Sequence, residues 1–189
     1  MFRSVSMFAL ATALAAPALA QQVVPARSEI GFVSKQMGVP VEGKFKQWTA
    51  QISFDPKKPE AGSVAFSIQT GSASFGAAET DAEVPKAAWF NVAKFPTASF
   101  ASSSILALGG GKFEVRGKLA IKGASQDVVV PVVITQTMTQ AGAASTAAGS
   151  FTIKRLDFKI GEGEWADTSM VANDVTVKFK LALTGMAPL

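Results

Sequence analysis

Apolar and polar residues alternate along almost every segment of this chain from about position 22 onward. Between positions 112 and 122, for example, Phe113, Val115 and Leu119 alternate with Glu114 and Arg116. A period of two places successive side chains on opposite faces of a β-strand. The pattern therefore predicts long strands with one apolar face and one charged face. Because strands do not alternate with helices, a parallel α/β sheet is not expected.

Glycine-rich turn signals separate the alternating runs at hairpin spacing. They include Met37–Pro40, Asp55–Gly62, Gly109–Gly111 and Gly161–Gly163, all of which are typical of chain reversals. We therefore predict an all-β fold of about eight antiparallel strands, arranged as a sandwich or as a closed barrel. Residues 77–88 break the alternation and predict a short helix or an ordered loop.

The apolar face is rich in phenylalanine, since the chain has 14 Phe and no Tyr. A buried tyrosine needs a hydrogen-bond partner for its hydroxyl group, so an interior without tyrosine is suited to an apolar ligand. The same residues could also fill each other's space as an ordinary core. Lysines on the opposite face, such as Lys118, Lys122 and Lys178, argue against a lipid-facing barrel, where each would cost about 2–4 kcal/mol. The residues predicted to line an apolar pore are Phe32, Phe45, Phe54, Phe66, Ile68, Phe100, Phe113, Val115, Leu119, Val130, Val132, Ile134, Phe151, Ile153, Val177 and Phe179.

The first 20 residues have the features of a secretory signal peptide. Arg3 is followed by an apolar run over residues 7–16 and then by Ala18-Leu19-Ala20, a small-residue cleavage pattern. The apolar run is shorter than the about 20 residues that span a bilayer. We therefore expect cleavage after Ala20, a periplasmic location, and a single domain over residues 21–189.

The chain contains no cysteine and no histidine. Disulfides, thiolate catalysis and Cys-ligated metal sites are thereby excluded, and so is a Ser-His-Asp triad. The net charge is +4, and the basic residues are scattered rather than gathered in the stripe typical of nucleic-acid binders. We expect no catalytic residues, no metal, no cofactor and no nucleic-acid partner.

Several short segments form an ordered set that covers nearly all of the chain after position 20. They are Ser28–Lys35, Val41–Phe45, Ile52–Asp55, Thr80–Asp81, Trp89–Val92, Lys94–Phe100, Phe113–Leu119, Ile121–Gly123, Arg155–Phe158, Gly161, Trp165, Asp167 and Val175–Leu181. This set resembles the YceI-like family of bacterial periplasmic polyisoprenoid-binding proteins. The resemblance implies an eight-stranded, lipocalin-like antiparallel barrel with one short helix near one mouth. It also implies an isoprenoid or similar amphiphilic lipid in the central pore, and no enzymatic activity.

Lys35, Asp81 and Arg155 are the candidate polar residues of the pore mouth. The family often has His where Lys35 stands, and an Arg-Asp pair where Thr80-Asp81 stands. Lys35 would therefore offer a lipid head group a fixed positive charge instead of a titrating one. Asp81 lies in the stretch expected to be helical, where a carboxylate caps a helix more often than it takes part in acid–base chemistry.

Arg155 stands where the alternation changes parity, since Ile153 belongs to one apolar set and Leu156 to the other. Either a bulge exchanges the two faces near Arg155, or its side chain points inward at the end of the apolar layer. An inward guanidinium could meet a phosphate or a quinone carbonyl. It could instead pair with Asp157 or Asp81 and close the end of the barrel.

The leading hypothesis is a binding protein for a long isoprenoid, either a polyprenyl phosphate or a respiratory quinone. The alternative is a non-catalytic structural or partner protein of a membrane complex with a self-filled barrel core, and a homodimer is also open. An enzyme acting on a lipid through Lys35, Asp81 or Arg155 is a third hypothesis, but the sequence offers it no paired nucleophile and base. Trp89 and Phe90 are expected to pack the helical stretch onto the barrel as a plug.

Overall fold

The computed structural model describes residues 21–139 and 142–189. The predicted signal peptide, residues 1–20, lies outside the described residues, so export and cleavage stay predictions. Within the described part of the chain, no helix is both long enough and apolar enough to cross a membrane.

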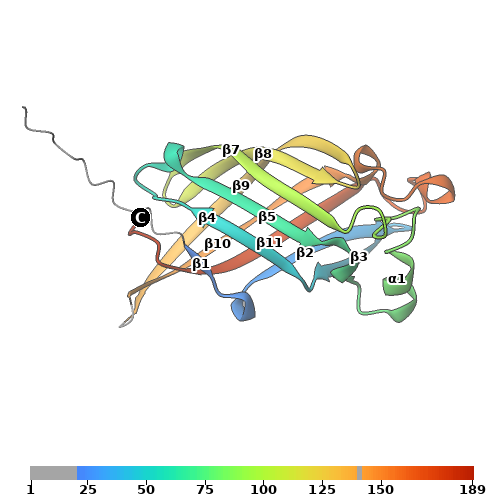
Figure 1. The fold of residues 1–189 in the computed structure, drawn as a ribbon, viewed down its shortest axis with the longest axis horizontal. Helices are drawn as coiled ribbons and strands as arrows, with labels where there is room; N and C mark the ends of the chain where they lie inside the picture. The colour runs from blue at the N-terminus through green and yellow to red at the C-terminus, as the bar shows by residue number, and fades with distance from the viewer. Residues whose placement is uncertain (1–20, 140–141) are drawn as a thin grey trace, which may run out of the picture.

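One antiparallel sheet of eleven strands, curled into a half-barrel, makes up most of the protein (Figure 1). The strands are β1 (Gln22–Val23), β2 (Glu29–Gln36), β3 (Val39–Phe45), β4 (Trp48–Ser53), β5 (Ser63–Gln69), β6 (Ala73–Ser74), β7 (Thr97–Gly109), β8 (Lys112–Ile121), β9 (Ala124–Thr139), β10 (Gly142–Lys154) and β11 (Asp174–Thr184). Their hydrogen-bonded order is β4-β5-β7-β8-β9-β10-β11-β2-β3-β6, and β1 pairs with β11. The prediction of an all-β antiparallel fold is confirmed.

The predicted count of eight strands was wrong, because short breaks divide stretches that the alternation treats as continuous. The 3-10 helix η1 (Pro25–Arg27) separates β1 from β2. Between β3 and β4, the backbone N–H of Lys46 donates to the Ser72 carbonyl (3.1 Å), and the Gln47 carbonyl accepts from Gln69 (3.0 Å). β6 has two residues, which is too few for a period of two to show.

Gln21 and β1 lie between the edge strand β4 and the strand β11. The backbone N–H of Gln21 donates to the Ile52 carbonyl of β4 (3.0 Å), and its side-chain oxygen accepts from the Phe54 N–H (2.7 Å). Gln22 pairs with Thr184 of β11. This N-terminal segment therefore joins two strands that do not pair with each other within the described part of the sheet.

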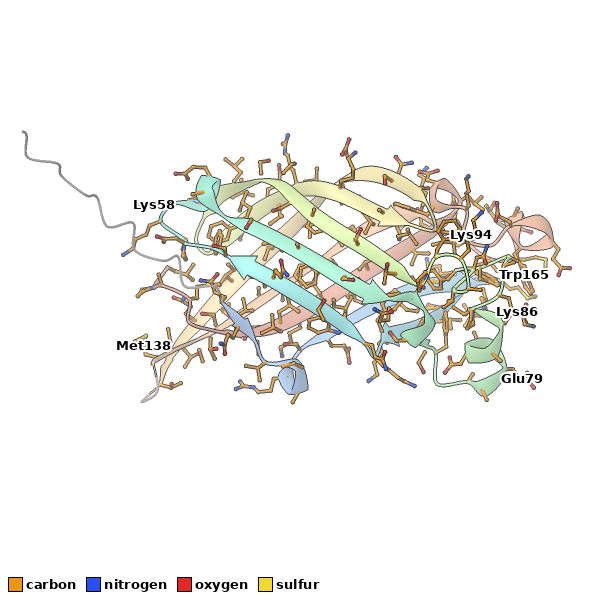
Figure 2. All side chains as sticks on the ribbon, in the orientation of Figure 1. Lys58, Glu79, Lys86, Lys94, Met138 and Trp165 are labelled. Atoms are coloured by element: carbon orange, nitrogen blue, oxygen red, sulfur yellow. The ribbon has the colours of Figure 1, made fainter. Side chains whose placement is uncertain are left out.

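The connections between strands gather at two ends of the sheet. The helical segments are α1 (Ala78–Glu83), η1, η2 (Pro59–Ala61), η3 (Thr70–Ser72), η4 (Arg155–Phe158) and η5 (Gly163–Ala166). Glu79, Lys86 and Trp165 mark one end in Figure 2, and Lys58 and Met138 mark the other. We call these the helix end and the hairpin end. The short helix predicted within residues 77–88 is confirmed as α1.

Phenylalanine rings inside the sheet lie against glycines of neighbouring strands. Phe179 stands directly opposite Gly149 across the β10–β11 ladder. A Cβ atom added to Gly149 would come within 2.7 Å of the Phe179 ring, and one added to Gly117 would come within 2.6 Å of the Phe100 ring. Glycine marks a place where another group approaches the backbone closely. The two glycines therefore let large rings approach the backbone of the inner wall closely.

Candidate functional site

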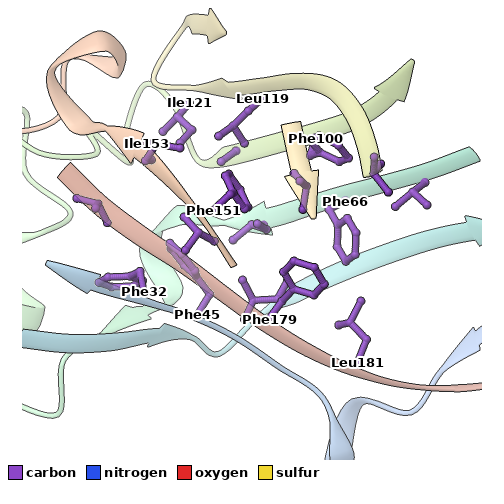
Figure 3. Close-up of a pocket in the computed structure, with 18 of the residues that line it drawn as sticks. Phe32, Phe45, Phe66, Phe100, Leu119, Ile121, Phe151, Ile153, Phe179 and Leu181 are labelled. Atoms are coloured by element: carbon purple, nitrogen blue, oxygen red, sulfur yellow. The ribbon is translucent and has the colours of Figure 1, made fainter. Parts of the chain in front are cut away.

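An apolar cavity of about 230 Å³ lies inside the curled sheet. In Figure 3, Phe66, Phe100, Phe151 and Phe179 extend from different strands into the same space. The structure places all sixteen residues predicted for the apolar pore on the wall of this cavity. Their contact with a ligand stays a prediction.

The wall also contains residues that the sequence reasoning missed. Two of them, Ile30 and Ser34, continue the parity of Phe32 along β2, so extending the alternation in both directions would have found them. Other missed wall residues belong to segments in which apolar and polar residues do not alternate, so alternation could not have placed them. These wall residues include Phe75, Val84, Trp89, Phe90 and Ile160 at the helix end, and Met186 at the hairpin end.

A cluster of aromatic rings closes the helix end of the cavity. The Phe32 ring lies 5.2 Å from the Phe45 ring and 5.1 Å from the Phe75 ring, and Phe45 lies 6.1 Å from Phe90. Tilted and edge-on contacts at such distances are the favoured aromatic geometries. Phe90 therefore packs the segment after α1 onto the sheet, as expected for a plug, while it also forms part of the cavity wall.

Arg155 is buried at the helix end, with 2% of its surface exposed. Its guanidinium donates to five backbone carbonyls: Ile160 (2.8 Å), Gly161 (3.0 Å), Trp165 (2.7 Å), Val171 (2.7 Å) and Ala172 (3.1 Å). A guanidinium has five N–H groups, so every donor of Arg155 is used. Burial lowers the pKa of this guanidinium from its ordinary value.

This arrangement differs from both roles considered for Arg155 in the sequence. Its side chain does reach the cavity wall, but its partners are main-chain carbonyls rather than Asp157 or Asp81. The change of parity arises because the chain leaves β10 and begins η4 at Arg155. The guanidinium thus holds the two 3-10 turns η4 and η5 and the segment before β11 together.

Asp81 fixes α1 to the sheet. One carboxylate oxygen accepts from the Ser74 hydroxyl (2.7 Å) and the other from the Phe75 N–H (2.6 Å). These hydrogen bonds, led by the one from Phe75, hold the pKa of Asp81 below its ordinary value. Asp81 is not among the residues that line the cavity.

Lys35 lies on the outer face of the sheet. Within β2, Phe32 and Ser34 line the cavity, so Val33 and Lys35 point the other way. Lys35 instead borders a separate, more polar pocket together with Lys154 and residues near Asn173. The structure therefore does not bring Lys35, Asp81 and Arg155 to one pore mouth.

Lys122 is a buried cation that the sequence reasoning had assigned to the outer face. Its ammonium group donates to the Lys159 carbonyl (2.7 Å) and to the Glu162 carboxylate (2.8 Å), and 5% of the residue is exposed. The bond from Lys122 lowers the pKa of Glu162. Lys122 and Arg155 therefore hold the loop of residues 159–162 from two sides. No group of three metal-ligating residues occurs in the described chain.

A sequence profile of the YceI-like domain matches residues 21–183. The chain belongs to the YceI-like family. Among solved structures, this YceI-like chain is similar to BcnA of Burkholderia cenocepacia, with 43% sequence identity and a TM-score of 0.81 over 85% of this chain and 99% of that one. The resemblance expected from the ordered segments is therefore confirmed.

More distant structures share the fold of this YceI-like chain. The YCEI protein of Campylobacter jejuni is 24% identical, with a TM-score of 0.69 over 75% of this chain and 83% of that one. A polyisoprenoid binding domain from Saccharophagus degradans, implicated in plant cell wall breakdown, is 16% identical, with a TM-score of 0.67 over 86% and 97%. At these identities the likeness shows the fold alone.

Curated sequence relatives carry the description UPF0312 protein. The relative from Azotobacter vinelandii is 36% identical over 88 residues, which is 47% of this chain and 46% of the relative. One from Vibrio cholerae is 29% identical over 106 residues, 56% of either chain. The matches thus span about half the length of these relatives.

Proposed function

We propose that this chain is a periplasmic binding protein, exported by cleavage after Ala20, that holds a long isoprenoid lipid in the cavity of the sheet. In the bound state the curved sheet closes around the lipid as a barrel. The observation that carries the proposal is the cavity itself, which is lined almost wholly by aliphatic and aromatic side chains. Binding without catalysis is the function proposed.

The size of the cavity argues against a self-filled core. Ordinary protein interiors have few voids larger than a water molecule, and an apolar cavity of about 150 Å³ already takes up benzene. The cavity found here is about 230 Å³. Small-molecule pockets commonly measure about 300–1,000 Å³, so we expect a long lipid to push part of the wall outward.

Relatives support the same class of ligand. The Saccharophagus degradans neighbour is described as a polyisoprenoid binding domain, and its sheet has the same fold. The apolar wall of the present cavity offers the environment that such a chain requires, because burial of each CH₂ group contributes about 0.8 kcal/mol. A membrane-complex partner and a homodimer stay predictions from the sequence.

The test is to fill the cavity and measure binding and stability on the same protein. Val132 lines the cavity and is paired with Phe113 of the neighbouring strand β8, so Val132→Trp should abolish binding of a long isoprenoid. The matched control is Val133→Trp on the same strand, because Val133 is 44% exposed and points outward. The control should bind as the wild type does.

Native mass spectrometry of wild-type protein purified from its own periplasm should reveal a bound lipid, and that lipid should be absent from Val132→Trp. A quinone titration provides a second readout, because saturable quenching of Trp emission indicates binding near Trp89 or Trp165. Overpacking a filled core typically costs about 1–3 kcal/mol. If Val132→Trp loses that stability in a protein that never carried lipid, the carrier proposal is wrong.

A further inference from the structure

The β2–β3 hairpin turns at Met37 and Gly38, and Met37 has an unfavourable backbone conformation there. Gln36 pairs with Val39, so Met37 and Gly38 form the whole loop, and their φ angles are 50° and 83°. Two positive φ angles are characteristic of a type I′ turn, in which Asn or Gly normally occupies the first position. Other residues are uncommon at positive φ. The turn geometry therefore does not explain why a methionine stands here.

Packing does not explain Met37 either. The residue is 79% exposed, so its side chain buries little apolar surface against the rest of the chain. Val39 is 63% exposed. The backbone N–H of Met37 donates to the Met170 carbonyl (2.8 Å), and Met170 is 47% exposed. We call Met37, Val39 and Met170 the apolar tip. An unfavourable conformation without a packing role points to a function outside the folded chain.

The apolar tip lies at the helix end of the molecule. In Figure 1, β2 and β3 run toward the end that carries α1. The segment before β11 lies alongside, because the Ala172 N–H donates to the Lys35 carbonyl (2.9 Å) and Val171 forms a β-bridge with Gln36. The hairpin turn and this segment therefore present the tip together.

The polar pocket beside the apolar tip carries two lysines without partners. Lys35 and Lys154 line it together with three threonines and Asp174. Neither ammonium group forms an ion pair or a hydrogen bond with another described residue. Since Asp174 is the one acidic residue among those that line the pocket, one positive charge is left without a counter-charge. Ammonium groups are strong donors to phosphate oxygens.

Apolar side chains next to unpaired ammonium groups match the surface of a phospholipid bilayer. Proteins that lie on a membrane bury apolar side chains at the boundary between head groups and acyl chains, and their lysines are attracted to anionic lipids. A protein partner fits this tip less well. Stable protein interfaces use about 20–30 residues on each side, whereas the tip has three.

We propose that the helix end docks on an anionic phospholipid bilayer, with the apolar tip in the acyl region and with Lys35 and Lys154 on lipid phosphates. The unusual residue in the turn is then explained, because the Met37 side chain is buried by the membrane rather than by the fold. Docking goes beyond the proposed lipid binding and does not require a ligand in the cavity.

The first experiment tests the apolar tip by flotation with vesicles of mixed phosphatidylethanolamine and phosphatidylglycerol. Met37→Asn removes the apolar side chain and supplies a residue that the turn favours, so the unfolding midpoint should not fall. Its affinity for the vesicles should weaken about tenfold. Met138→Asn is the matched control, because Met138 is 73% exposed at the hairpin end, and this variant should float as the wild type does.

The second experiment tests the two lysines by comparing these vesicles with vesicles of phosphatidylcholine, which has no net charge. In the wild type the anionic vesicles should bind more tightly. Replacement of Lys35 and Lys154 by Gln should lower the ratio of the two affinities about fivefold for each lysine. Lys58→Gln is the control, because Lys58 is exposed at the hairpin end and its loss should leave the ratio unchanged.

The third experiment uses the wild type alone, so it depends on no variant that must fold. Methionine methyl groups are observed by NMR in the presence of the anionic vesicles doped with a spin-labelled phospholipid. The signals of Met37 and Met170 should broaden. Those of Met138 and of the buried Met186 should remain.

Several results would overturn the docking proposal. They are a wild type that floats with neither vesicle, equal losses for Met37→Asn and Met138→Asn, an unchanged affinity ratio in the lysine variant, and equal broadening of all the methionine signals. A lipid-free dimer that Met37→Asn dissociates would instead assign the tip to a second copy of the chain. None of these measurements detects isoprenoid in the cavity, so either proposal can fail while the other stands.

Discussion

Replacing Arg155 with methionine tests the role of the most heavily bonded side chain in the protein. Methionine keeps much of the apolar stem and removes the charge and all five donors. Because each donor meets a backbone carbonyl at 2.7–3.1 Å, the substitution leaves five acceptors without their present partner. We expect the helix end to lose its internal support.

The magnitude follows from the burial of this group. A buried acceptor left without a partner costs about 1–3 kcal/mol, but five such costs are not additive, since the loops relax and water enters. We therefore expect Arg155→Met to lose about 3–5 kcal/mol, well below the sum of the five separate costs, which is a large loss for a single substitution and is typical of a broken buried hydrogen-bond network. Arg155→Lys retains the charge with three donors at most, so its loss should be smaller.

Urea unfolding followed by circular dichroism measures the effect. With a slope of about 2 kcal/mol per molar urea, the midpoint of Arg155→Met should fall by roughly 2 M. Lys154→Met is the matched control, because Lys154 is the preceding residue and is exposed; its midpoint should stay close to that of the wild type. In ligand titrations on protein that remains folded, prenyl phosphate and prenyl alcohol should weaken alike. A loss below about 1 kcal/mol, or a selective loss of phosphate binding, would refute the structural role.

Two further substitutions test other parts of the fold. The pKa of Asp81 is held below its ordinary value, so its hydrogen bonds stabilise the fold above about pH 4, and this contribution disappears as the pH falls through the lowered pKa. The unfolding midpoint of Asp81→Asn should therefore change less between pH 6 and pH 3 than that of the wild type. An equal change of the midpoint in both proteins would contradict this. Gly149→Ala places a methyl group 2.1 Å from the Pro131 carbonyl oxygen and 2.7 Å from the Phe179 ring, so its thermal midpoint should reflect a loss of at least about 1–3 kcal/mol. Ser150→Ala, at an exposed neighbour, should melt as the wild type does.

The wall of the cavity could be predicted from the sequence because a period of two directly specifies which side chains face inward. Val132 and Phe179 belong to long, uninterrupted strands, where the parity is unambiguous. Trp89 and Met186 could not be placed this way, because they lie outside the strands. Their positions depend on how the chain packs after it leaves the sheet, and alternation carries no information on that packing.

The polar residues show a second limit of sequence reasoning. The parity change at Arg155 correctly marked an unusual position, but the five acceptors of its guanidinium are main-chain carbonyls, which every residue possesses and no residue type reveals. Lys122 ends the alternating run of β8, and its positive φ of 49° turns the chain so that the ammonium group points to Glu162. Charge and parity alone assigned it to the solvent.

The N-terminal segment between β4 and β11 also determines the order in which the sheet can be completed. Gln21 contacts Gly185, which is 164 residues further along the chain, and Phe54, which is 33 residues away. The first residues of the described sheet therefore acquire their partners on β11 and at Gly185 only after the last strand has been made. Contacts over such sequence separations slow folding, so this edge of the sheet stays open while the rest of the protein is being assembled.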